Sequence, residues 1–237
     1  MKSIPPQAFS VAAAIWLTAA CAPSQFTTAT IYDTPAAFVR LELDRTVEKG
    51  REHSHPQSIL PEHMAAALAG IMIEEPFTKL PFYDDTSQPR RHRAFTEKEV
   101  TFFAPLLAVA LGQATPEEIV TFYESRDVSG TVREVTSGGM FIQGETLRIR
   151  LANYRSLTHQ SADIGVAETQ DDRLTPLRSL APQRGRLHFE PRSSMPPDPD
   201  KALTGMFSWE PREVAVLYRS LPPRQMTPAQ PNPLLRP

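Results

Sequence analysis

Residues 130–151 read GTVREVTSGGMFIQGETLRIRL, and this stretch decides the fold class. Short runs of β-branched or apolar residues alternate in it with residues that favour turns. Three antiparallel strands joined by tight glycine turns are therefore predicted. The predicted strands cover residues 130–135, 140–142 and 146–151, and the predicted turns cover 137–139 and 144–145.

The last of these strands shows which face is buried. Leu147, Ile149 and Leu151 are separated by Arg148 and Arg150. A period of two is typical of a strand with one face in the core, because successive side chains point to opposite faces. The three aliphatic side chains are therefore expected in the core, and the two arginines are expected to face water.

Three other segments are predicted to be strands. Residues 36–43 alternate in polarity around Val39 and Leu41, and residues 186–190 alternate again. Residues 213–218 are apolar on both faces, which suits a central strand, although a helix fits that segment nearly as well.

Three helices are predicted in the first half of the chain. The first covers residues 61–74, with Pro61 in its first turn. The second covers 96–112 and opens with Thr96 and Glu99, which form a capping box. The third covers 115–125 and opens on a similar pattern, with proline at the first helical position.

These elements predict an α+β fold: a single antiparallel sheet of five or six strands, with three helices packed on one face. Residues 35–221 are expected to form this domain. A polar, Thr- and Ala-rich tether is expected over residues 21–34. Residues 222–237 contain six prolines and are expected to be a disordered tail.

The N-terminus resembles that of a bacterial lipoprotein. Lys2 is followed by an apolar run that closes with Leu17-Thr18-Ala19-Ala20-Cys21. This ending is similar to a lipobox, with Thr18 at the position where leucine is commonest. The alternative is an ordinary cleaved signal peptide beside an incidental cysteine.

The resemblance implies that residues 1–20 are a signal peptide and that Cys21 is the lipidated N-terminus of the mature chain. Several acyl chains on one residue anchor a protein stably to a bilayer. Ala22 is consistent with an outer-membrane destination, because an aspartate there is the inner-membrane retention signal of enteric bacteria. The expected location is thus the cell envelope, with the protein lipid-anchored to the outer membrane and facing the periplasm.

Composition excludes one class of partner. The 237-residue chain has a formal net charge of −2, with 25 Lys and Arg against 27 Asp and Glu. A nucleic-acid partner would call for a basic patch or stripe, so none is expected. With Cys21 lipidated, no second cysteine remains for a disulfide. The expected partners are the membrane, through the anchor, and an envelope protein.

Two groups of side chains are candidate sites. His53, His55 and His63 could supply three nitrogen ligands to zinc, although their spacing matches no standard site and solvated loop histidines are the alternative. A second loop could bind an anion or a sugar acid, or its charges could neutralise each other. Its charged residues are Asp84, Asp85, Arg90, Arg91 and Arg93.

No catalytic motif accompanies these groups. Ser137-Gly138-Gly139 lacks the flanking pattern of a nucleophile elbow or a phosphate loop, and a hairpin turn explains it. We therefore expect no cofactor and a non-enzymatic accessory or binding module. The alternatives are an envelope hydrolase that uses the three histidines, with or without metal, and a small-anion or sugar sensor that uses the second loop.

Overall fold

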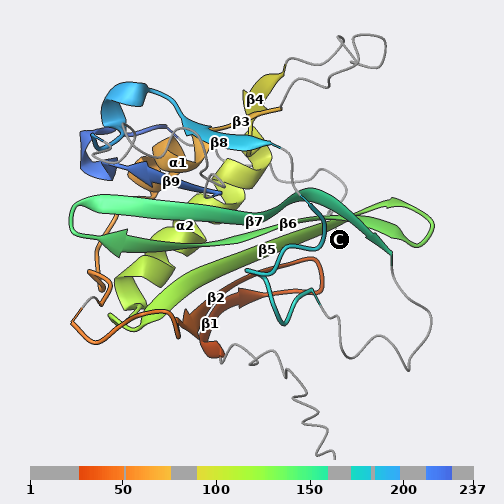
Figure 1. Ribbon diagram of the computed structural model, residues 1–237, viewed down its shortest axis with the longest axis horizontal. Coiled ribbons are helices and arrows are strands. Elements are labelled where there is room, and N and C mark those ends of the chain that lie inside the picture. Colours follow the sequence, from red (N-terminus) through yellow and green to blue (C-terminus); the bar gives the residue numbers. More distant parts are fainter. Residues whose placement is uncertain are drawn as a thin grey trace, which may run out of the picture.

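The computed structural model describes residues 27–50, 52–75, 90–159, 172–182, 185–197 and 212–225. It is a mixed α/β structure with a six-stranded antiparallel sheet, a small three-stranded sheet and, within those ranges, two α-helices (Figure 1). The strand order of the large sheet is β1-β2-β5-β6-β7-β9. Its strands are β1 (Thr27–Asp33), β2 (Ala37–Leu43), β5 (Glu118–Ser129), β6 (Val132–Gln143), β7 (Thr146–His159) and β9 (Glu213–Val216).

Both helices, α1 (Pro61–Ala69) and α2 (Glu97–Gln113), contribute to one core with the same face of the large sheet. The predicted capping box of α2 is confirmed, since Thr96 and Glu99 satisfy each other's backbone N–H groups. Leu147, Ile149 and Leu151 are buried in this core, as predicted. The opposite face of the sheet is therefore the one that carries Arg148 and Arg150.

The third predicted helix is wrong, because its residues form most of β5. Glu118 Oε2 accepts a hydrogen bond of 2.7 Å from the backbone N–H of Thr115, as in a capping box, but no helix follows. Residues 118–123 are buried on both faces, and their β-branched and aromatic side chains favour a strand between two neighbours.

The first predicted helix is too long. It ends at Ala69, and β3 (Ile71–Glu74) follows Gly70. A Cβ atom at Gly70 would lie 2.5 Å from the ring of Phe189, so glycine allows the close approach of the strand that ends at Phe189. The small sheet has the order β4-β3-β8, with β4 (Arg91–Arg93) and β8 (Arg186–Phe189) on either side of β3.

The predicted turn at Ser137-Gly138-Gly139 is also wrong, because these residues lie inside β6. A Cβ atom at Gly138 would overlap the carbonyl oxygen of Arg150 on the neighbouring strand, so the glycine serves close strand packing. The register of β6 and β7 shifts on both sides of Ser137. The predicted turn at 144–145 is confirmed, and the other turn of this meander lies at Gly130; Gly130 and Gly144 both have positive φ.

The other predicted strands are confirmed with changes. The segment expected at 36–43 is β2, and the segment at 186–190 is β8 of the small sheet. The segment at 213–218 forms β9, which lies at the end of the strand order rather than in its centre. β1 begins at Thr27, inside the segment expected to be a tether.

A segment that we name the strap, residues 172–182, crosses the sheet face opposite the helices (Figure 1). Ser137 Oγ donates a hydrogen bond of 2.7 Å to the carbonyl oxygen of Pro176 in the strap. Asn153 Nδ2 donates to the carbonyl oxygen of Arg178, and Asn153 Oδ1 accepts from the backbone N–H of Leu180, both at 2.8 Å. Buried side chains of β6 and β7 therefore hold the strap by its backbone.

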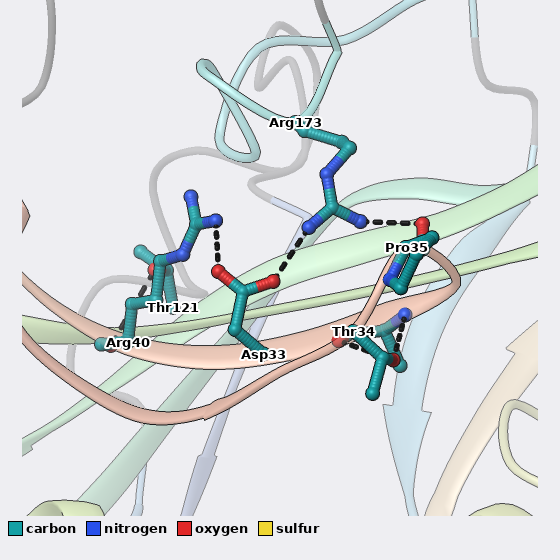
Figure 2. A network of polar contacts seen from close by, with 7 residues as sticks. Asp33, Thr34, Pro35, Arg40, Thr121 and Arg173 are labelled. Atoms are coloured by element: carbon teal, nitrogen blue, oxygen red, sulfur yellow. Dashed lines mark hydrogen bonds and ion pairs between the residues drawn. The ribbon is translucent and has the colours of Figure 1, made fainter.

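The strap is also fastened to the β1–β2 hairpin. Figure 2 shows Arg173 donating hydrogen bonds to the carboxylate of Asp33, at 2.7 Å, and to the carbonyl oxygen of Pro35, at 2.6 Å. Arg40 donates to the other oxygen of Asp33. Asp33 thus lies between two guanidinium groups, one from the sheet and one from the strap.

The start of the predicted tail is attached to the helices. Arg224 donates from its backbone N–H to the carbonyl oxygen of Glu62, at 3.0 Å, and its side chain pairs with Glu97. Residues 226–237 lie outside the described residues. Within the described ranges, neither helix has the length and hydropathy needed to span a bilayer.

Candidate functional site: a groove beside the strap

A groove of about 740 Å³ lies on the sheet face opposite the helices, and we name it the sheet groove. Its floor includes Ile119 and Phe141 from the central strands. Its sides are residues 43–48 with His53, the pair of strands β7 and β9, and the strap. Small-molecule sites typically enclose about 300–1,000 Å³, so the groove is large enough for one.

The β7 side of the groove is cationic. Arg148 and Arg150 project from the same face of β7, because they are two residues apart. Arg148 Nη1 lies 2.9 Å from Oε1 of Glu213, and Arg150 Nη2 lies 3.1 Å from Oε2 of the same carboxylate. One negative charge is therefore shared by two positive charges at this side.

The strap contributes Thr175, Leu177 and Arg178 to the groove. Leu177 lies above Gly139, where a Cβ atom would come within 2.9 Å of its Cδ2 atom. Arg178 is exposed, and its guanidinium group has no recorded partner among the residues that the structure describes. The strap thus adds one apolar and one positively charged side chain.

The loop side contains an Asp–His pair. His53 Nε2 donates a hydrogen bond of 3.0 Å to Oδ2 of Asp44, and Thr46 donates to Oδ1 through its hydroxyl and backbone N–H groups. Burial alone would raise the pKa of Asp44, but these hydrogen bonds outweigh it and lower the pKa to about 2. The imidazole packs on Phe141, with ring centroids 4.3 Å apart. This contact fixes the orientation of the ring.

His55 lies behind this pair, away from the groove lining. Its ring centroid is 5.5 Å from that of His53, and its side chain is buried. Within the described ranges of the chain, neither ring nitrogen has a hydrogen-bond partner. Burial, together with the neighbouring His53, lowers the pKa of His55 to about 4. His55 is therefore neutral at pH 7.

Glu42 is a second buried ionisable group and lies on β2. Its Oε2 atom has no hydrogen-bond partner among the described residues. Burial raises the pKa of Glu42 to about 7, against the hydrogen bond with Thr121 and the charge of Arg40.

The structure brings two of the three candidate metal ligands together. His53 and His55 are neighbours, but His63 lies on α1, and Asp44 is the hydrogen-bond partner of His53. Among the described residues, no group of three or more His, Cys, Asp or Glu side chains is arranged to hold a metal ion. The geometry therefore does not favour the three-histidine zinc site.

The predicted anion loop is described only in part, because Asp84 and Asp85 lie outside the described residues. Arg90 donates to the carbonyl oxygen of Glu75, at 2.8 Å. Arg91 pairs with Glu190, and Arg93 pairs with Glu97. Each of these arginines is engaged within the fold. Cys21 also lies outside the described residues.

One signal for the groove is present in the sequence. The alternation around Arg148 and Arg150 correctly predicts that they lie on the sheet face opposite the core, but it does not predict the strap that partly covers this face. The other lining residues are spread from Leu43 to Glu213, and no local pattern connects them.

Comparison with known proteins does not add to this picture. No family model matches the chain, and no curated protein or solved structure is significantly similar to it. The groove and its contacts therefore carry the functional argument.

Proposed function

We propose that the chain is a lipid-anchored binding module of a bacterial cell envelope, with the sheet groove as its ligand site. The observation that carries the binding role is the groove itself, which combines charged sides with apolar side chains in its lining. Ligand sites typically join an apolar surface to a few polar groups that fix orientation. An envelope protein as a further partner stays a prediction.

The location is supported by the sequence around Cys21. Mass spectrometry of the natively expressed chain tests it, because a lipidated Cys21 at the mature N-terminus adds acyl groups to the first peptide. A free thiol at Cys21, or a leader that is still attached, would contradict the anchor. A Cys21→Ser variant is the control and should lack the modification.

The binding role is tested with a chemically broad thermal-shift screen of the full chain. A groove ligand should stabilise the wild type, because a ligand that binds only the folded state raises its stability. The effect should be lost in Leu177→Asn, where the lining is changed, and kept in Leu174→Asn. Leu174 is the matched control because it lies on the same strap, is 58 % exposed and does not line the groove. A screen without any such compound would contradict the groove proposal.

A second candidate function rests on the Asp44–His53 pair, which could make the groove the site of a metal-independent ester hydrolase. With Nε2–H held by Asp44, Nδ1 of a neutral His53 can accept a proton from an attacking water. Hydrolysis of p-nitrophenyl octanoate by the wild type, and its loss in His53→Asn, would support this candidate. Equal rates for the two proteins would exclude it.

A further inference from the structure

We propose that the ligand of the sheet groove is an anion that carries an apolar chain or ring. Arginine side chains would bind its charged head, and the apolar part of the lining would bind its body. This inference rests on the proposed function, because it names the ligand class of the same groove.

The charges of the groove favour an anionic head. Its lining contains four arginines and three carboxylates, in a chain whose formal net charge is −2. Glu213 is shared by Arg148 and Arg150, and Asp44 is held by His53 and Thr46. Guanidinium groups bind carboxylates and phosphates through paired, charge-assisted hydrogen bonds. The groove thus has positive charge to offer to a ligand.

The apolar lining favours a body that is not an ion. Ile119 is buried, whereas Leu43, Val47, Phe141 and Leu177 are only partly buried, so a ligand can cover the rest of their surface. Removing this apolar surface from water favours binding. A small inorganic anion would not use this surface.

Other ligand classes fit less well. A cation would meet the excess of arginines, and a neutral apolar ligand would take water from their guanidinium groups without replacing its hydrogen bonds. A long polyanion such as a nucleic acid would need a basic stripe beyond the groove, in a chain with a net negative charge.

Calorimetry on the full chain in lipid nanodiscs tests the inference, with empty nanodiscs as the blank for partition into lipid. Octanoate and octyl phosphate carry a head and a body, whereas 1-octanol lacks the charge and acetate lacks the body. At least one of the two amphiphilic anions should bind with an affinity about tenfold or more above the affinities of octanol and acetate. The two arms distinguish a carboxylate head from a phosphate head.

Two variants connect the binding to the groove. Arg150→Gln and Arg178→Gln should each weaken binding of the preferred anion by about tenfold, because each removes a charge-assisted contact. Arg192→Gln is the matched control, since Arg192 is exposed and lies on the 3₁₀ helix Arg192–Ser194, outside the groove lining. Its affinity should be unchanged.

The inference is overturned if octanol binds as tightly as the anions, if neither anion binds, or if the two groove variants behave like Arg192→Gln. A different result contradicts the proposed function. That result is a thermal-shift screen in which every compound, whatever its charge, either fails to stabilise the wild type or stabilises Leu177→Asn as well. A neutral or cationic compound that passes that screen would leave the groove as a ligand site and reject the anionic class.

Discussion

Tyr123 donates a hydrogen bond of 3.1 Å from its hydroxyl group to Asp172, 49 residues further along the chain. Arg133 donates to the other oxygen of the same carboxylate, at 2.6 Å. Asp172 is only 4 % exposed. Burial and the charge of Asp172 raise the pKa of Tyr123 to about 12, so the phenol stays protonated at neutral pH and remains a donor. The strap is thus joined to two central strands at its first described residue.

Replacing Asp172 with alanine should destabilise the protein by about 3 kcal/mol, because it leaves the buried ends of Arg133 and Tyr123 without their partner. Urea unfolding followed by circular dichroism at pH 7 measures the loss. Asp33→Ala is the control, since Asp33 also pairs with a strap arginine but its side chain is 36 % exposed. Its loss should be about 1 kcal/mol or less. Equal losses would mean that burial does not strengthen the Asp172 attachment.

The elements that could be predicted from sequence are those fixed by local chemistry. The capping box at Thr96 and the alternation from Leu147 to Leu151 each satisfy backbone or burial requirements within a few residues. The wrong predictions are places where tertiary packing overrides a local signal. Gly138 is inside β6 because Arg150 passes close to it, and Glu118 begins a strand because it pairs with Leu43 of β2 and the following residues pair with both β2 and β6. The groove could not be predicted because its lining is assembled by strand pairing and by the strap.

Glu42→Gln should stabilise the protein near pH 8. In the folded state burial raises the pKa of Glu42 to about 7, from its ordinary value of 4.5. The folded state therefore binds more protons than the unfolded state between these values, and stability is lost as pH rises from 4.5 through 7. The glutamine variant avoids this loss, which is of the order of 1–3 kcal/mol. Unfolding at pH 4.5 and pH 8 measures it, with Glu145→Gln, an exposed turn residue, as the control.

The Glu42 prediction fails if the difference in unfolding free energy between variant and wild type is the same at both pH values. An equal pH-dependent stabilisation in Glu145→Gln would also contradict the prediction, because it would show that removing any carboxylate changes stability with pH.

His55→Gln should change the pH dependence in the opposite direction. Burial lowers the folded-state pKa of His55 to about 4, below its ordinary value of 6.5. The unfolded state therefore binds more protons in this range, and the contribution of His55 to stability is present above pH 6.5 and lost as pH falls toward 4. In the wild type, the effects of His55 and Glu42 on the free energy of unfolding should partly cancel between pH 4.5 and 6.5. Removing His55 should leave a protein whose stability falls as pH rises through that window, and a rise would contradict the assignment.

Gly138 and Gly139 should respond differently to alanine. A Cβ atom at Gly138 would meet the backbone oxygen of Arg150, which cannot move without disturbing β7. At Gly139 the two closest contacts would be the side-chain ends of Leu177 and Ile119, at 2.9 and 3.0 Å, which can shift, and the carbonyl oxygen of Val120 would lie 3.3 Å away. Gly138→Ala should therefore cost about 3 kcal/mol and Gly139→Ala about 1 kcal/mol.

Gly112→Ala is the control for these two glycine variants, measured by the same urea unfolding. Gly112 lies in the last turn of α2, and a Cβ atom there would meet nothing closer than 4.0 Å. Alanine should stabilise the helix by about 0.5–1 kcal/mol, because glycine is the poorer helix former. If Gly138→Ala were as well tolerated as Gly112→Ala, β6 and β7 could not approach as closely at this point as the structure has them. The close packing of β7 against Gly138 would then not explain the register shift between β6 and β7 beside Ser137.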